Sequence, residues 1–249
     1  MDPSQTRTAV ITGASSGIGE ATAVRLAGEG WLLVLGARRI DKLEDVAGRT
    51  KARALALDVR DPDSIAAFVG AIEEADVLVN NAGLALGLDP VAELSDDDVI
   101  TMWETNVLGL LRVTRALLPK LESTGNGHVV NLGSTAALET YPGGGGYTSS
   151  KHAVRALTRT MRLDLLGKPI RITDIHPGMV ATEFSDIRFH GDTGKAAGVY
   201  EGITPLVAED VADCIAWAVT RPWHVNIDEI VLRPVAQATS TVVARDAGL

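Results

Sequence analysis

The chain has 249 residues and a formal net charge of −9, a balance that opposes binding to nucleic acid or to an anionic membrane surface. Its single cysteine, Cys214, excludes an internal disulfide, and no cysteine or histidine cluster has the spacing of a metal site. No apolar run is long enough to span a membrane, and the polar residues 1–8 do not resemble a leader peptide. We therefore expect a cytoplasmic protein that holds no metal and binds neither nucleic acid nor membrane.

Short aliphatic runs alternate with helical patterns along the whole chain. Repeated strand and helix units of this kind predict an α/β fold, a doubly wound parallel sheet with helices on both faces. No linker interrupts the pattern, so residues 1–249 are expected to form a single domain. The strands are predicted at residues 8–11, 32–35, 54–57, 77–79, 128–132, 170–175 and 229–233, and helices at 20–29, 41–48, 61–74 and 208–220.

Two stretches give more detailed expectations. Ser95, three residues before Asp98, resembles a capping box and opens a long helical region that Pro119 is expected to kink or end. In the last predicted helix, Cys214 and Trp217 are expected to lie in the core, and Cys214 is not expected to be a nucleophile.

A glycine-rich stretch follows the first predicted strand and leads into the first helix. Gly13, Gly17 and Gly19 have no side chains there, so backbone amides and the helix N-terminus could approach a pyrophosphate closely. Glycines alone would also suit an ordinary tight turn, but the strand, turn and helix around them favour a dinucleotide site. No Lys followed by Ser or Thr ends the loop, which argues against a nucleoside triphosphatase.

The end of the second strand carries Arg38 and Arg39, where an NAD site usually has an acidic residue for the ribose 2′-hydroxyl. Guanidinium groups attract a 2′-phosphate, whereas a carboxylate would repel it. The two arginines could also be the solvated start of the next helix. With the adjacent glycine loop, they favour NADP.

Tyr147 and Lys151 are four residues apart, so both side chains project from one face of a helix. The ammonium is expected to lower the tyrosine pKa, so that the hydroxyl can exchange a proton with an alcohol or carbonyl oxygen. Ser134, at the end of a strand, could hydrogen-bond the same oxygen. Each signal alone is common in helices and turns.

In combination, the residues closely resemble the short-chain dehydrogenase/reductase family over nearly the whole chain. This resemblance implies a Rossmann-like fold and hydride transfer between a nicotinamide and a small hydroxyl or carbonyl substrate, without a metal. The residues that carry it are Thr12, Gly13, Ala14, Ser15, Ser16, Gly17, Ile18, Gly19, Asp58, Val59, Asn80, Asn81, Ala82, Gly83, Asn106, Ser134, Tyr147, Lys151, Pro177 and Gly178.

The resemblance also implies roles. Tyr147 would be the general acid/base and Ser134 would orient the substrate oxygen, so these two would form the substrate site. Lys151 would also bind the nicotinamide ribose, and Asn106 would support a water-linked proton relay. Taken alone, Asn81 and Asn106 would more readily be local backbone caps, and Pro177 and Gly178 an ordinary turn; the family pattern favours the functional roles. The expected NADP site consists of Gly13, Ser15, Ser16, Gly17, Ile18, Gly19, Arg38, Arg39, Asp58, Val59, Asn81, Tyr147, Lys151, Pro177, Gly178, Val180 and Thr182.

Further segments carry a narrower resemblance, at residues 80–90, 182–185, 188–189, 191–192, 194–196, 224–227 and 233–235. They are similar to the NADP-dependent 3-hydroxy acid dehydrogenases of this family, which also act on serine and allo-threonine. That subgroup implies a homotetramer. Residues 184–205 are expected to form a substrate lid, and Arg188, His190 and Lys195 are the cations near it that could meet a substrate carboxylate. Four glycines before Tyr147 and a different tail after Ala238 depart from the subgroup and leave the substrate open.

Two other functions compete with this one. A broad-specificity carbonyl or keto-reductase would use the same groups, because they activate an oxygen without specifying its surroundings. A non-catalytic nucleotide-binding regulatory protein would keep the fold without turnover. The presence of Ser134, Tyr147 and Lys151 together argues against the regulatory protein.

Overall fold

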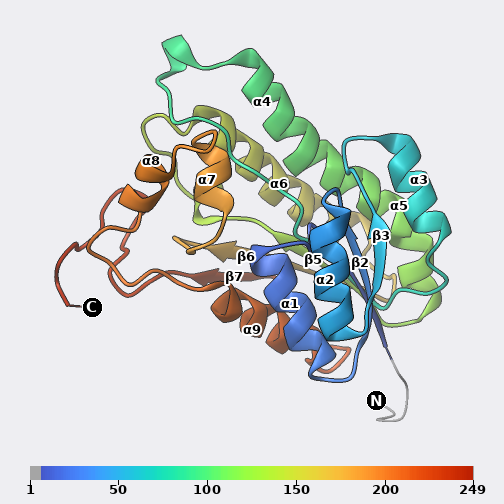
Figure 1. Ribbon diagram of the computed structural model, residues 1–249. Coiled ribbons are helices and arrows are strands. Elements are labelled where there is room, and N and C mark those ends of the chain that lie inside the picture. Colours follow the sequence, from blue (N-terminus) through green and yellow to red (C-terminus); the bar gives the residue numbers. More distant parts are fainter. Residues whose placement is uncertain (1–6, 249) are drawn as a thin grey trace.

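The computed structural model describes residues 7–248, in which seven parallel strands form one sheet in the order β3-β2-β1-β4-β5-β6-β7 (Figure 1). The strand order reverses between β1 and β4, which are neighbours in the sheet, and such a reversal opens a crevice at the carboxyl ends of the strands. The strands are β1 (Thr8–Thr12), β2 (Leu32–Ala37), β3 (Arg53–Ala56), β4 (Val77–Asn80), β5 (Gly127–Leu132), β6 (Ile170–Pro177) and β7 (Glu229–Leu232).

Helices cover both faces of the sheet (Figure 1). One face carries α1 (Gly17–Ala27), α2 (Ile40–Thr50) and α9 (Ala208–Val219); the other carries α3 (Pro62–Gly70), α5 (Leu110–Ser123) and α6 (Gly145–Asp164). Against α6 lies α4 (Asp96–Trp103), and α7 (Phe184–Arg188) and α8 (Thr193–Gly198) follow β6. The predicted α/β fold class is confirmed.

The side chains of β1 point in turn to the two faces of the sheet, and each face is covered by its own layer of helices. Ala9 and Ile11 point into the core beneath α1 and α9, whereas Val10, between them, points into the core beneath α3 and α5. Successive side chains of a strand face opposite sides, so a strand covered on both sides must be apolar throughout. All three residues are fully buried.

The region after Ser95 differs from the prediction in one respect. The Ser95 hydroxyl accepts a hydrogen bond from the Asp98 backbone N–H at 3.3 Å, so the helix start is as predicted. Pro119 lies inside α5, which continues to Ser123, so the expectation that Pro119 would end the helix is wrong. A proline removes one backbone hydrogen bond, but Leu117 and Leu121 remain fully buried on the same stripe and hold the last turn to the sheet.

The core prediction for the last helix is also partly wrong. Trp217 is 47% exposed, and Cys214 is only half-buried. The buried stripe of α9 includes Val211, Ile215 and Val219, which recur at the helical period and pack under the sheet, and Trp217 lies off that stripe. Burial raises the pKa of the Cys214 thiol, which is consistent with an unreactive side chain.

Among residues 7–248, no helix has both the length and the apolar character required to cross a membrane. The helical region between α4 and α5 contains a π-helical segment, Glu104–Gly109. Such segments change the direction of side chains within a continuous helix, and they are frequent at functional sites. Asn106 lies in this segment.

Candidate active site

A cleft of about 860 Å³ opens at the carboxyl ends of six strands. The residues that follow these strands and line its wall include Gly13 after β1, Arg38 after β2, Asp58 after β3, Asn81 after β4, Ser134 after β5 and Gly178 after β6. The cleft thus lies at the reversal of strand order, where open α/β sheets bind their ligands.

The glycine loop is packed so tightly that side chains would not fit. Gly13 has a φ of +66°, and a Cβ on it would lie 2.8 Å from the Cα of Ala82. A Cβ on Gly19 would lie 2.5 Å from Asn81 Nδ2 and 2.6 Å from the Gly13 carbonyl oxygen. The loop can therefore present bare backbone to the cleft at the start of α1, a geometry that fits a pyrophosphate.

Asn81 braces this loop from the end of β4. Its side-chain Nδ2 donates to the carbonyl oxygens of Thr12 and Gly13, at 3.0 and 3.1 Å. The Thr12 hydroxyl in turn accepts from the backbone N–H groups of Asn81 and Ala82. Asn81 lines the cleft, but its side-chain amide holds the loop in shape, a role closer to backbone capping than to direct cofactor contact.

Cations at the end of β2 converge on an acidic side chain. Arg39 Nη1 and Lys42 Nζ each donate to one oxygen of Glu183, both at 2.7 Å. Hydrogen bonding to Lys42, and then to Arg39, lowers the pKa of Glu183 to about 2. Arg39 Nη2 also lies 2.6 Å from the Ser16 hydroxyl and 3.3 Å from the Ser15 hydroxyl. In this structure the anion that Arg39 and Lys42 hold beside the glycine loop is the Glu183 carboxylate.

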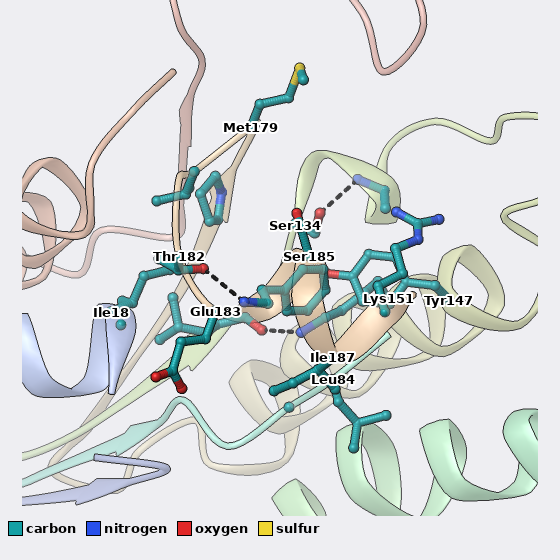
Figure 2. Close-up of a pocket in the computed structure, with 18 of the residues that line it drawn as sticks. Ile18, Leu84, Ser134, Tyr147, Lys151, Met179, Thr182, Glu183, Ser185 and Ile187 are labelled. Atoms are coloured by element: carbon teal, nitrogen blue, oxygen red, sulfur yellow. Dashed lines mark hydrogen bonds between the residues drawn. The ribbon is translucent and has the colours of Figure 1, made fainter. Parts of the chain in front are cut away.

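Tyr147 and Lys151 lie on α6 and face the cleft together, as Figure 2 shows. Tyr147 is 8% exposed and its ring makes an edge contact with Phe184, at 5.5 Å between centroids. Lys151 Nζ donates to the Leu132 carbonyl oxygen at 2.7 Å and lies 5.8 Å from the centre of the Tyr147 ring. The predicted spacing of four residues does bring both groups to one wall.

Burial and three neighbouring side chains act on the pKa of Tyr147 in this structure. Burial raises the pKa of Tyr147 above its ordinary value, and the nearby Tyr141 raises it further. The Ser134 hydrogen bond and the charge of Arg188 lower the pKa, but burial outweighs both. Burial also lowers the pKa of Lys151 to about 8. In this structure the phenol is neutral, which is the form that can donate a proton.

Ser134 lies two residues after the end of β5 and is held by two sets of contacts. Its hydroxyl accepts from the Ala136 backbone N–H at 3.1 Å, and its carbonyl oxygen lies 3.1 Å from Nδ1 of His176. His176 is fully buried, and its Nε2 lies 3.4 Å from a carboxylate oxygen of Asp174, which is also fully buried. A buried acid and imidazole therefore lie directly behind Ser134.

This buried pair has shifted pKa values. Burial raises the pKa of Asp174 to about 7, although the charge of Lys151 opposes the rise. Burial lowers the pKa of His176 to about 4, opposed by its hydrogen bond to the Ser134 backbone. Lys151 and Arg155 from α6 and Glu229 from β7 also act on the pair. The sequence carries no signal for this pair, because the alternation of side chains along β6 does not reveal which polar residues meet.

Asn106 lies behind the cleft and does not line it. Its Oδ1 accepts from the Leu84 backbone N–H at 2.9 Å, and its Nδ2 donates to the Leu84 carbonyl oxygen at 2.8 Å and to the Ser150 hydroxyl at 3.0 Å. The side chain thus clamps the segment after β4, and the Leu84 side chain of that segment lines the cleft. The π-helical turn directs Asn106 toward this segment.

The cleft gathers most of the predicted site. Gly19 and Asn106 do not line the cleft; Gly19 packs against the glycine loop, and Asn106 holds the segment after β4. Of the three lid cations, Arg188 lines the cleft, whereas the His190 and Lys195 side chains are 61% and 70% exposed elsewhere. Glu183 lines it too, within the segment 177–185 that was expected to border the nicotinamide, but its contact with Arg39 was not predicted because the two residues are 144 positions apart in the sequence. The predicted residues that line the cleft are Gly13, Ser15, Ser16, Gly17, Ile18, Arg38, Arg39, Asp58, Val59, Asn81, Ser134, Tyr147, Lys151, Pro177, Gly178, Val180 and Thr182.

Comparison with known proteins places this geometry in a family. The family profile described as short chain dehydrogenase matches residues 7–191. An uncharacterized oxidoreductase of Mycobacterium tuberculosis is 53% identical over 235 residues, 94% of each chain. An NADP-dependent 3-hydroxy acid dehydrogenase of Schizosaccharomyces pombe is 42% identical over 250 aligned positions, 96% of each chain.

A solved structure gives the same result. The closed form of a serine dehydrogenase complexed with NADP+ superposes with a TM-score of 0.91 at 38% identity, over 96% of this chain and 99% of that chain. The resemblance drawn from the sequence motifs is therefore confirmed. The chain belongs to the short-chain dehydrogenase family, a family of oxidoreductases.

Proposed function

We propose that the protein is an NADP-dependent oxidoreductase that interconverts the hydroxyl and carbonyl forms of a small 3-hydroxy acid, such as serine or allo-threonine. The observation that carries the proposal is the convergence of Ser134, Tyr147 and Lys151 in the cleft that also holds the glycine loop and Arg39. A proton donor and a dinucleotide cradle thus share one space. The names of the relatives, an NADP-dependent 3-hydroxy acid dehydrogenase and a serine dehydrogenase, support the substrate class.

The cofactor would lie between the glycine loop and α6. The bare backbone of Gly13 and Gly17 would receive the pyrophosphate, and Arg38 and Arg39 would receive the 2′-phosphate. Asp58 and Val59 would flank the adenine, and the segment after β6 would border the nicotinamide. When bound, the nicotinamide supplies or accepts the hydride.

The chain's own groups then handle the proton. Ser134 Oγ would donate a hydrogen bond to the substrate carbonyl oxygen and hold it near the Tyr147 hydroxyl. In reduction, Tyr147 would give its proton to that oxygen as the alcohol forms, and in oxidation it would take the proton back. The buried Lys151 ammonium would stabilise the transient tyrosinate, since a positive charge near the phenolate favours the charged form.

The surroundings of the cleft complete the proposal. Residues 184–205, which include α7 and α8, would act as a lid that excludes water from the reacting groups.

We also propose that the protein is a homotetramer and that it is located in the cytoplasm.

A substrate panel tests this function against the broader carbonyl reductase. Purified protein would be assayed at the nicotinamide absorbance with hydroxy acids, neutral alcohols and neutral ketones, each with NADP and NAD. The proposal expects the highest kcat/KM for 3-hydroxy acids with NADP. Comparable values for neutral ketones would favour the carbonyl reductase, and no turnover with any substrate would favour the regulatory protein.

A further inference from the structure

Arg188, at the end of α7, is a half-buried cation in the wall of the cleft. Its Nε donates to the Gly87 carbonyl oxygen at 3.2 Å, and its Nη2 donates to the Tyr141 hydroxyl at 3.1 Å. Both partners are neutral, so these contacts fix the orientation of the guanidinium without balancing its charge.

No carboxylate among residues 7–248 forms an ion pair with Arg188, although arginines elsewhere in that range repeatedly pair with acids, Arg39 with Glu183 and Arg233 with Glu139 among them. Within the same range, Nη1 of Arg188 has no hydrogen-bond partner. A half-buried guanidinium without a counter-ion is less well stabilised than one that is paired with an anion. An anionic ligand in the cleft would provide that counter-ion.

The guanidinium lies close to the proton donor. Its Cζ is 5.9 Å from the centre of the Tyr147 ring and 5.5 Å from the centre of the Tyr141 ring. A 3-hydroxy acid spans about 5 Å from hydroxyl to carboxylate, estimated from bonds of about 1.5 Å. This length is comparable with the separation between the Arg188 guanidinium and the Tyr147 ring, so we expect one such molecule to hydrogen-bond Tyr147 at one end and to reach Arg188 at the other.

The glycine run before Tyr147 makes room for this arrangement. A side chain on Gly144 would overlap the ring of Tyr141, which the bare backbone allows to lie close. Tyr141 in turn holds Arg188 through its hydroxyl. Gly144 thus lies next to the predicted substrate pocket.

We propose that Arg188 is the receptor for the substrate carboxylate and selects hydroxy acids in which one carbon atom separates the carboxylate from the reacting carbon. This assignment rests on the proposed function. It makes Arg188 a specificity-determining residue, because a neutral alcohol of the same size would leave the guanidinium without a counter-ion.

The test compares an acid with its own ester. For the native protein, kcat/KM is measured for 3-hydroxybutyrate and for its methyl ester, which has the same hydroxyl and carbon skeleton without the charge. Arg188→Gln removes the charge, and Arg188→Lys keeps it without the two-pronged geometry. Lys195→Gln is the matched control, because it removes one positive charge from the same lid segment at a side chain that is 70% exposed and outside the cleft.

The expected result is a change in the ratio of the two kcat/KM values, acid over ester. A charge-assisted contact of about 1.5 to 3 kcal/mol predicts a fall of about tenfold to a hundredfold in Arg188→Gln. Arg188→Lys should lie between this variant and the native protein, and Lys195→Gln should keep the native ratio. Thermal unfolding and NADP titration of each variant check that the fold and the cofactor site are intact.

Other outcomes distinguish a failure of the Arg188 assignment from a failure of the proposed function. If the native protein oxidises the acid and Arg188→Gln keeps the native ratio, Arg188 is not the receptor and the proposed function stands. Equal losses for acid and ester would assign Arg188 to lid structure and overturn the specificity role. If the native protein oxidises only the ester, the 3-hydroxy acid function fails and the Arg188 assignment fails with it.

Discussion

Tyr147 is the side chain on which the proposed chemistry depends. Burial keeps its hydroxyl neutral, and Ser134 and Lys151 lie on the same wall of the cleft. Replacing it with phenylalanine removes one oxygen and leaves the ring contact with Phe184 in place.

We predict that Tyr147→Phe lowers single-turnover hydride transfer by about a hundredfold or more, because general acid/base catalysis contributes about that much. NADP affinity and thermal stability should stay close to those of the native protein. Single-turnover kinetics measure the first quantity and calorimetric titration the second. Near-native transfer by the variant would show that another group moves the proton.

Asp174 and His176 make opposite contributions to the pH dependence of stability. The pKa of Asp174 is about 7 in the fold against an ordinary 3.8, so the folded state binds more protons and Asp174 lowers stability as pH rises from about 4 to about 7. The pKa of His176 is about 4 against an ordinary 6.5, so the folded state binds fewer protons and His176 raises stability over nearly the same range. In the native protein the two effects largely offset each other.

Asp174→Asn removes the destabilising contribution and leaves that of His176. We therefore predict that the free energy of unfolding of this variant rises more steeply between pH 4 and pH 6.5 than that of the native protein. His176→Gln should show the opposite, a fall with rising pH. Denaturant unfolding at several pH values measures the slopes, and parallel curves for native protein and variants would contradict the assignment.

At the level of the elements, short aliphatic strands were predictable because a strand buried on both faces must be apolar, as Val77 to Val79 in β4 are. The four-residue spacing likewise predicted that Tyr147 and Lys151 share a helix face. Contacts between distant segments were not predictable. Glu183 meets Arg39 across 144 residues, and the outward position of Trp217 depends on which stripe of α9 packs under the sheet.

The contact of Glu183, the residue before the lid, with Arg39 and Lys42 affects the choice between NADP and NAD. Glu183 occupies Arg39 and Lys42 with its own carboxylate, so a 2′-phosphate must compete with it for Arg39. We predict that Glu183→Gln binds NADP several-fold more tightly, whereas NAD binding, which lacks the phosphate, changes little. Glu201→Gln, an exposed acid farther along the chain, is the control.

Removing the arginines, instead of the acid that pairs with them, tests the same group of cations. Arg38→Ala with Arg39→Ala should remove most of a preference for NADP over NAD that we expect to be at least about tenfold. NADP binding should also weaken as salt rises, because the extra phosphate charge is screened. Calorimetric titration of both cofactors at two salt concentrations measures these effects. If the double variant still prefers NADP, the 2′-phosphate binds at residues other than Arg38 and Arg39.

At the scale of the whole molecule, apolar side chains remain exposed on the last helix and the closing segment. Trp217 is 47% exposed, Val231 43% and Val235 88%. Burial of such side chains against other subunits would remove them from water. We predict a homotetramer that uses this region, which light scattering checks directly. Val235→Glu should weaken the assembly, and a native monomer at micromolar concentration would rule out the quaternary prediction.

The central claim is that the cleft transfers a hydride between NADP and a 3-hydroxy acid. The most direct measurement follows deuterium from NADPH labelled at C4 into the product of a 3-oxo acid, detected by mass spectrometry. The account predicts one deuterium at C3 of the hydroxy acid formed by the native protein, and almost none with Tyr147→Phe over the same time. Absence of label in the native product, with both C4 positions tested separately, would contradict the account.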